Sequence, residues 1–586
     1  NTLAPHGTDG TLLLDPADIY IADSLVNAQG AGMPGADTTA DDNTPGGGVY
    51  EVETGGATGS FLATGTLETQ LESGNVVINA TGGGAGDGDI FVVDAIQPTN
   101  DLGANRSLTM LAQDIMVNAM IDATAEAGGD HAIDVILNAT NNGGGTIDIN
   151  AAITTNGGLF TANATNNVDI IDGGIVTAGG TVDITAGGTI RGAEATNATA
   201  NIAAGAGDII LSAGTGIGDA AGTGGLDVDA DSGATIEIEL TTSGAARVDY
   251  ESTDADALTL DIDNATINGD VVFVSGATGT LSLTDTDINA GSLTVTSGGA
   301  INLNQRLDLT DGAGDVTLTA TTSGIVLGNA DDLIDAGAGT VTLNATAGAI
   351  TALEATGDGG TEINTSGAII FNAASVGTSG NQVGFENATS LTIMDGGGTG
   401  TDVELQELGA ATTVTAIDIT SASATAGGIT IDLLGGNDVA IAEGHVLTTV
   451  TLNDATTSAT FTYTATAGDI AVGSIDTRDQ AITLTAASGG IDEVANNTTA
   501  KITTSDTLTL LATGGAIGDN ANGNALLDID VASLNASTDT TGIYIREVDG
   551  LTIVDASGSG GVDGVRTTGG NADVEITLAA GDLALT

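Results

Sequence analysis

The 586-residue chain carries 77 acidic and only 8 basic residues, and its net charge of −69 excludes nucleic acid and anionic lipid as ligands. With no Cys and no Trp, it is not expected to form disulfides, thiolate metal sites or the aromatic-rich cores of a multidomain globular enzyme. The hydrophobic share of 41% is nevertheless too high for a disordered acidic chain, so Val, Ile, Leu and Ala must form the core.

The N-terminal 60 residues differ in composition from the rest. Residues 10–21 predict a strand, a turn and a second strand, and residues 28–59, rich in Gly, Asp, Thr and Pro, predict a long loop. All five prolines lie at or before Pro98, which leaves 488 residues without one. Because proline cannot donate to a sheet ladder, this absence favours uninterrupted strands in the remainder of the chain.

From residue 61 onward, apolar residues alternate with Thr, Asp or Asn in short segments that return every 23 to 28 residues or so. Alternation at period two is typical of a strand with one buried face, and repetition at this length is typical of stacked coils. The equivalent positions are Leu108, Met110 and Ala112 with Val135, Leu137 and Ala139; Val182, Ile184, Ala186 and Ile190 with Ile209, Leu211, Ala213 and Ile217; Val316, Leu318, Ala320 and Ile325 with Val341, Leu343, Ala345 and Ile350; and Ile482, Leu484 and Ala486 with Leu508, Leu510 and Ala512.

These patterns predict an all-β protein, a right-handed parallel β-helix (β-solenoid) that forms an elongated rod. We expect residues 1–60 to be an N-terminal region and residues 61–586 to be one continuous shaft. The predicted core includes Ile482, Leu484, Leu508 and Leu510, together with the Val and Leu pairs at 316/318 and 341/343.

Four N-terminal segments occur in a specific order: GTLLLDPADIYI at 10–21, TLETQLESGNVVI at 66–78, GDGDI at 86–90 and SLTMLAQDIMVNA at 107–119. The segment at 10–21 resembles the one that ends the secretion module of filamentous-haemagglutinin-like exoproteins, which are large β-helical adhesins. The later segments resemble the ordered series that follows this module and leads into the β-helical shaft, so the resemblance covers residues 10–155. The resemblance implies two-partner secretion with an outer-membrane transporter as partner. The upstream secretion module, with its Asn-Pro-Asn-Leu signature, is not part of this sequence.

No catalytic motif accompanies these repeats. The three histidines, His6, His131 and His445, are widely separated, Lys501 is the single lysine, and the seven arginines are dispersed. Some polysaccharide-active enzymes use parallel β-helices, which keeps a carbohydrate enzyme as the lowest-ranked alternative. We expect no enzymatic activity, and no pocket that joins a carboxylate pair to a basic residue.

The acidic residues are the other candidate chemistry. Asp227, Asp229 and Asp231 alternate along one predicted strand, and Asp528 and Asp530 occupy matching places in a related block about 300 residues later. Oxygen ligands on one face suit Ca²⁺, so these five residues are candidate calcium ligands. The alternative is that Asp merely suits turns and outward positions. Residues 434–439 (LGGNDV) form a single incomplete match to a calcium-binding nonapeptide.

Twelve asparagines begin an Asn-X-Ser/Thr sequon and are glycosylation candidates. The alternative is that Asn stacks or turns at the ends of strands and produces the motif by accident. The candidates are Asn79, Asn105, Asn138, Asn163, Asn197, Asn264, Asn344, Asn364, Asn387, Asn496, Asn497 and Asn535.

Together these features favour a secreted structural or adhesive shaft of an extracellular, cell-surface exoprotein. Its expected partners are glycans or proteins on host or neighbouring cells, without nucleic acid and without a membrane span. The second interpretation is a self-assembling subunit of an extracellular fibre or surface layer. Whether the purified chain is a monomer or forms filaments separates the two.

Overall fold

A computed structural model describes most of the chain. The described residues are 18–33, 59–80, 88–140, 145–171, 173–192, 200–218, 225–231, 233–262, 267–284, 286–309, 314–328, 333–353, 361–378, 381–395, 402–407, 416–420, 429–433, 445–447, 450–451, 460–465, 469–478, 481–493, 499–519, 526–554, 564–569 and 572–585.

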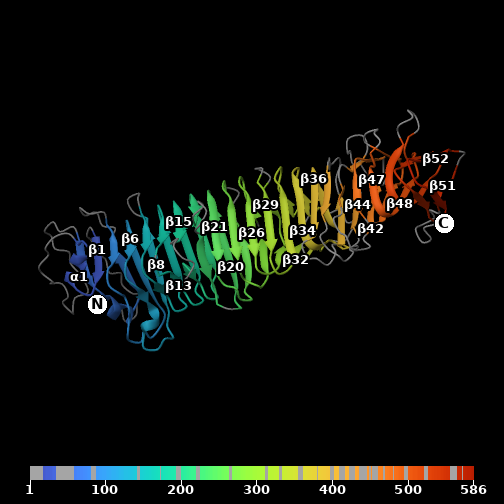
Figure 1. The fold of residues 1–586 in the computed structure, drawn as a ribbon. Coiled ribbons are helices and arrows are strands. Elements are labelled where there is room, and N and C mark those ends of the chain that lie inside the picture. Colours follow the sequence, from blue (N-terminus) through green and yellow to red (C-terminus); the bar gives the residue numbers. More distant parts are fainter. Residues whose placement is uncertain are drawn as a thin grey trace. The chain divides into compact units, whose positions relative to one another are not determined.

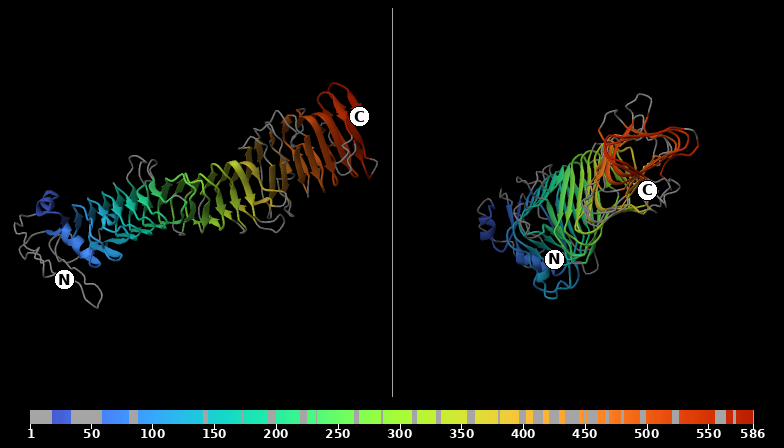
Figure 2. Two further views of the ribbon diagram at one scale, coloured as in Figure 1. Left: turned by 90° about the horizontal axis from the view of Figure 1, so that it is seen from below. Right: turned by 45° about the vertical axis from the view of Figure 1, so that its right-hand side comes forward.

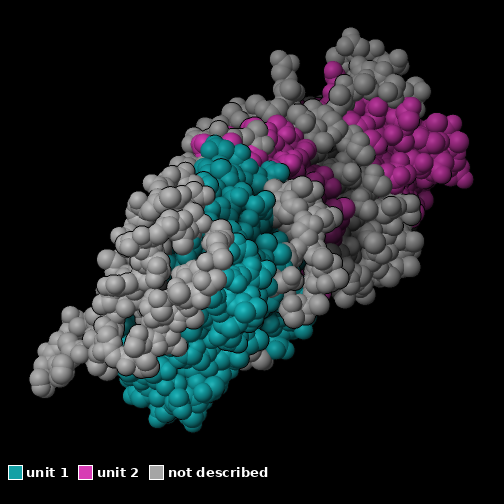
Figure 3. All heavy atoms as spheres, turned by 90° about the vertical axis from the view of Figure 1, so that its left-hand side faces the viewer, with its two compact units in different colours: residues 1–282 teal, residues 283–586 magenta. Residues whose placement is uncertain are grey.

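The chain divides into two compact units, residues 1–282 and 283–586 (Figure 3). Each unit is a parallel β-solenoid in which short strands pair with their counterparts one coil earlier and one coil later (Figures 1 and 2). Strand β24 (Leu281–Thr284) spans the division. The predicted all-β solenoid class is therefore confirmed.

Unit 1 stacks its strands in three columns. The first contains β3 (Val76–Asn79), β5 (Arg106–Ala112), β8 (Ile133–Ala139), β11 (Phe160–Ala164), β14 (Val182–Ala186), β17 (Ile209–Ala213), β20 (Thr235–Thr242) and β22 (Ala257–Asp261). The second contains β2 (Gly59–Ala63), β1 (Asp18–Ala22), β4 (Ile90–Val92), β6 (Ile115–Val117), β9 (Ile147–Ile149), β12 (Val168–Ile170), β15 (Thr189–Gly192), β18 (Gly216–Ile217), β21 (Ala245–Tyr250) and β23 (Val271–Ser275). The third contains β7 (Ile121–Asp122), β10 (Ile153–Thr154), β13 (Ile175–Val176), β16 (Ile202–Ala203) and β19 (Leu226–Asp229).

Unit 2 repeats this arrangement. One column contains β26 (Leu293–Ser297), β29 (Val316–Ala320), β32 (Val341–Ala352), β34 (Ala368–Val376), β36 (Ser390–Asp395) and β38 (Ala416–Thr420). A second contains β27 (Ile301–Leu303) and β30 (Ile325–Leu327), and continues through the ends of β32 and β34. A third contains β25 (Thr286–Asp287), β28 (Leu307–Asp308), β31 (Ile334–Asp335), β33 (Ile363–Asn364) and β35 (Val383–Glu386).

Further along unit 2, one series of pairings joins β37 (Asp402–Glu407), β39 (Ile429–Leu433), β42 (Thr460–Ala465), β45 (Ala481–Ala486), β47 (Ile502–Ala512) and β48 (Leu527–Thr538). The neighbouring strands are β40 (His445–Leu447), β41 (Val450–Thr451), β43 (Ile470–Val472), β44 (Ile475–Arg478) and β46 (Ile491–Glu493). The last strands are β49 (Ile543–Glu547), β50 (Leu551–Ile553), β51 (Val565–Thr567), β52 (Val574–Leu578) and β53 (Leu583–Leu585).

The register predicted from the repeats is the register of the structure. Leu108 pairs with Val135, Val182 with Ile209, and Ile482 with Leu508, each across adjacent strands. The pairs at 316/341 and 325/350 align in the same way. All eight predicted core residues are fully buried, because inward positions alternate with Thr, Asn and Asp along each strand.

The described strand nearest the N-terminus is inserted into the stack rather than appended to it. Strand β1 pairs with β2 on one side and with β4 on the other, and the predicted boundary at 60/61 falls within β2. Helix α1 (Leu25–Gly30) packs over the outer face of β1, where Tyr20 stacks on Phe91 with ring centroids 4.6 Å apart. Helix formation at Ala28–Gly30 differs from the predicted loop, because Ser24 accepts a hydrogen bond from Asn27 N and caps the helix.

Two further helical segments were not predicted. Helix α2 (Thr64–Leu71) buries Leu67 and Leu71, which lie four residues apart and so share one helical face. A 3₁₀ turn, η1 (Ala123–Ala125), follows β7. Among the described residues, no helix is long and apolar enough to span a membrane.

Candidate functional site

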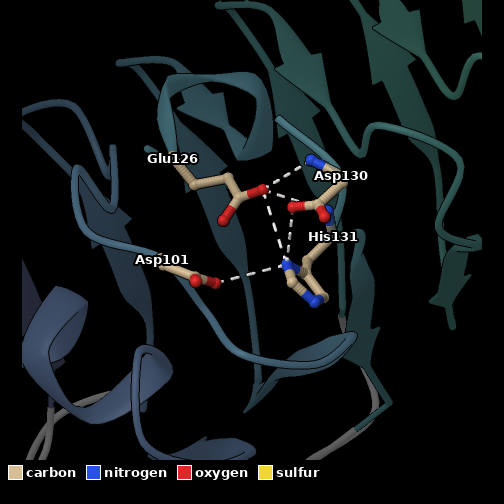
Figure 4. Close-up of side chains that lie close together, drawn as sticks. All are labelled: Asp101, Glu126, Asp130 and His131. Carbon is tan, nitrogen blue, oxygen red and sulfur yellow. Dashed lines mark hydrogen bonds and ion pairs between the residues drawn. The ribbon is translucent and has the colours of Figure 1, made fainter. Parts of the chain in front are cut away.

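A cluster of ionisable side chains projects from the coil corner that follows β7 (Figure 4). It consists of Asp101, Glu126, Asp130 and His131, and one ligand-capable atom from each lies within 4.8 Å of those of the others. Asp101 precedes β5, whereas the other three belong to the loop between η1 and β8, one coil later. Coil stacking therefore brings together residues that the sequence separates by one repeat.

The loop that carries His131 is hydrogen-bonded to coils on both sides. Asn105 Oδ1 of the preceding coil accepts from Ala132 N at 3.1 Å. Asn156 Nδ2 of the following coil donates to the carbonyls of Gly129 and His131, at 3.2 and 2.9 Å. Asn156 has a φ of 56° and Gly129 a φ of 64°, so both corners use left-handed backbone. The loop that carries His131 is consequently held in place by hydrogen bonds to both neighbouring coils.

Glu126 is the buried centre of the cluster. Its carboxylate accepts hydrogen bonds from Leu102 N, Asp130 N and His131 N, at 3.1, 2.7 and 3.0 Å. The Leu102 N–H in the first place, joined by those of His131 and Asp130, lowers the pKa of Glu126 to about 2, although burial acts in the opposite direction. Glu126 therefore stays ionised at any ordinary pH.

The imidazole of His131 faces three carboxylates at once. Its Nδ1 lies 3.1 Å from Asp130 Oδ1, 3.4 Å from Asp101 Oδ1 and 3.6 Å from Glu126 Oε1 (Figure 4). This nitrogen is shielded from solvent, yet it makes no hydrogen bond to any described residue. Gly128 leaves room beside the carboxylates, because a Cβ there would lie 2.4 Å from Asp130 Oδ1.

A second acidic group lies in unit 2 and includes one predicted ligand. Asp530 of β48, Glu547 of β49 and Asp549 have carboxylate oxygens within 4.8 Å of one another. Glu547 points inward, opposite Ile529, and accepts from Val531 N at 3.3 Å and Val548 N at 3.0 Å. Burial, assisted by Asp530 and opposed by these N–H groups, raises the pKa of Glu547 to about 7.

The other predicted calcium ligands lie in different surroundings. Asp227 is almost fully buried opposite Asp249, and burial raises its pKa. Burial likewise raises the pKa of Asp229, with Asp256, Asp254 and Asp231 adding to the effect. Asp227, Asp229 and Asp231 are not among the described groups whose ligand atoms converge within 4.8 Å. Asp528 forms an ion pair with Arg546 on the neighbouring strand.

The two blocks that contain these aspartates share backbone geometry. Gly218 and Gly518 have φ values of 70° and 68°. A Cβ at either position would meet a carbonyl oxygen of the next coil. It would also meet the backbone N atom of the leucine that begins the following strand. These leucines are Leu226 and Leu527. The repeated sequence thus forms the same local turn in both units.

Many Asp and Asn side chains connect successive coils through the backbone. Asp134 Oδ1 accepts from Leu159 N, Asp208 Oδ1 from Glu237 N, and Asp315 Oδ1 from Thr340 N, at 2.9, 3.0 and 2.7 Å. In each case the side chain satisfies an N–H group one coil later. Some of the aspartates therefore serve backbone hydrogen bonding at strand entries.

The sequon asparagines occupy several environments. Asn163 Nδ2 donates to Asn138 Oδ1, and Asn387 Nδ2 donates to Asn364 Oδ1, each across adjacent coils. Asn344 donates similarly to Thr319, Asn79 is half-buried in β3, and Asn105 is exposed at a loop. Asn535 has no exposed surface, so its side chain is inaccessible in the folded chain. Asn197, Asn264, Asn496, Asn497 and residues 434–439 lie outside the described residues.

Arginines pair with aspartates on neighbouring strands. Arg191 makes a two-point contact with Asp169, at 2.8 and 3.0 Å. Arg306 reaches both Asp308 and Asp335, which face each other on β28 and β31. Strand stacking aligns equivalent aspartates, so a basic residue can meet two carboxylates outside any described pocket. The expectation that no pocket joins a carboxylate pair to a basic residue stays a prediction. Asp308 is half-buried and Asp335 is buried.

The cluster around His131 was missed from the sequence. Asp101 precedes Glu126 by 25 residues, one coil length, and Gly128-Gly129 provides the turn that returns Asp130 and His131 toward Glu126. Aligning the loops at the repeat period would have placed Asp101 beside Glu126. The three histidines are far apart in sequence, so their spacing alone gives no sign of this cluster.

Comparisons with known proteins complete these observations. No protein-family model matches the chain, and neither the curated proteins nor the solved structures contain a match. The fold and the side-chain clusters define the chain as a parallel β-solenoid protein with an acidic surface.

Proposed function

We propose that the chain is a structural and adhesive shaft of a secreted, cell-surface exoprotein that resembles the filamentous haemagglutinins. The observation that supports this proposal best is the separation of apolar and polar residues between the inward and outward positions of each strand. Inward residues are almost all Val, Ile, Leu or Ala, while outward residues are small and polar or acidic. A coil built from these few residue types can be repeated, and a scaffold of such coils gains length as coils are added.

The acidic surface supports an extracellular role in contact with other surfaces. With 77 acidic against 8 basic residues, the chain repels nucleic acid and anionic lipid. Cell-surface glycans or proteins remain suitable partners, bridged where necessary by divalent cations. Export through an outer-membrane transporter belongs to the same proposal, because it follows from the N-terminal resemblance.

Attachment and self-association can be measured separately. Cells that produce the protein should adhere to host cells or matrix, and cells lacking it should not. In sedimentation velocity the purified chain should remain a monomer. Equal attachment with and without the protein would contradict the adhesive role, and concentration-dependent filaments would favour the fibre-subunit alternative.

A further inference from the structure

We propose that Asp101, Glu126, Asp130 and His131 bind one divalent first-row transition-metal ion of the Zn²⁺ type, through His131 Nδ1 and one oxygen of each carboxylate. The inference rests on the geometry around the imidazole and is independent of the adhesive function.

The separations are close to those between ligands of one ion. A tetrahedral ion with bonds of about 2.0–2.2 Å holds its ligands roughly 3.3–3.6 Å apart. His131 Nδ1 lies 3.1, 3.4 and 3.6 Å from the three carboxylate oxygens. Asp101 and Asp130 are largely exposed, with side-chain exposures of 65% and 73%, so their carboxylates can rotate to complete the coordination.

An ion pair with a protonated histidine explains the arrangement less well. An imidazolium N–H directed at carboxylates would donate a hydrogen bond to one of them. Nδ1 instead makes no hydrogen bond to a described residue, although solvent does not reach it. A nitrogen that faces three acceptor oxygens without a hydrogen bond is oriented as a metal ligand would be.

The negative charge around His131 favours a bound cation. Three carboxylates converge here, and Arg106 of the same coil directs its Nη2 to the carbonyl oxygens of Leu102 and Glu72 rather than to them. The Glu126 carboxylate is oriented by three backbone N–H groups, as outer-shell hydrogen bonds orient metal ligands. A ligand set of one nitrogen and three oxygens favours Zn²⁺, Co²⁺ or Mn²⁺ over Ca²⁺, which prefers oxygen alone.

The bound ion would join two consecutive coils. Asp101 belongs to the coil of β5, and the other three ligands belong to the loop that leads into β8. Because the unfolded chain does not preserve this arrangement, binding should raise the midpoint of thermal unfolding of unit 1.

Titration of the chelator-treated 586-residue chain with ZnCl₂ tests the proposal. Calorimetry should show one saturable site, and H131N should weaken it at least about tenfold. His131→Asn retains the main-chain N–H that bonds to Glu126, and D101N retains an acceptor for Gly103 N. D101N should also weaken binding, so the test holds even if one variant folds poorly by circular dichroism.

Two variants control for charge and for histidine binding elsewhere. D254N removes an exposed carboxylate outside the cluster, and H445N removes another histidine; both should bind Zn²⁺ as the wild type does. The proposal would be overturned by the absence of saturable binding, by unchanged affinity in H131N, or by equal displacement of Zn²⁺ by Ca²⁺. That last result would assign the ion to the diffuse acidic surface.

Discussion

At the scale of single residues, the structure uses buried carboxylates in two opposite ways. Glu126 is surrounded by backbone donors that stabilise its charge and lower its pKa. Glu547 occupies an inward position of a strand, where burial outweighs the N–H groups around it. Backbone N–H groups act on both carboxylates, so the balance of these hydrogen bonds against burial, with His131 beside Glu126 and Asp530 beside Glu547, decides which one stays ionised.

Glu547→Gln should make folding less dependent on pH. Because the folded pKa of Glu547, about 7, lies above its ordinary value of 4.5, its protonated form favours the folded state. The contribution of Glu547 to stability should be most favourable below about pH 4.5 and fall until about pH 7, by roughly 3 kcal/mol. E547Q should raise the unfolding midpoint at pH 8 and change it little at pH 4.

Thermal unfolding at several pH values checks this prediction, with E575Q as the control, since Glu575 is an exposed glutamate on β52. Equal effects of E547Q at pH 4 and pH 8 would show that the carboxylate does not take up a proton on folding.

At the scale of elements, the coil is held by its alternating core and by side chains that reach the next coil. Ser292 Oγ accepts from Asp315 N, and Asp315 Oδ1 accepts from Thr340 N, so three successive coils are connected at one corner. The function of Asp315 here is to accept a hydrogen bond, which does not require its charge.

Asp315→Ala and Asp315→Asn should therefore differ. The alanine variant leaves Thr340 N without its acceptor and should lose about 1 kcal/mol of stability. The asparagine variant retains Oδ1 and should be nearly neutral. Urea unfolding measures both, and an equal loss in the two variants would attribute the effect to charge rather than to the hydrogen bond.

The strand register was predictable because it depends on a strict alternation that repeats along the chain. Val182 and Ile209 could be aligned by pattern alone, and a shift of one residue would have turned every apolar side chain outward. The cluster around His131 was not predicted, because it depends on loop conformation and on left-handed turns at Gly129 and Asn156. Helix α2 was missed because its apolar residues fall within a stretch interpreted as shaft.

At the scale of the whole molecule, charge and repetition determine what the chain can do. Each unit consists of coils that contact their neighbours, so stability is distributed along the stack. Stabilisation of the folded chain by calcium stays a prediction. Carboxylates such as those of Asp530 and Asp549, which converge with Glu547, are candidate ligands.

Removing one coil in register tests the central claim, that equivalent coils are interchangeable structural units. Deletion of Val182–Asp208 brings Ile209 to the position of Val182, its partner in the present stack. The shortened chain should keep its β-type circular dichroism and unfold cooperatively within a few degrees of the wild type. Deletion of Val182–Ile209 places Ile210 at the inward position, and should disrupt the coils around it. Equal disruption by both deletions would contradict the account.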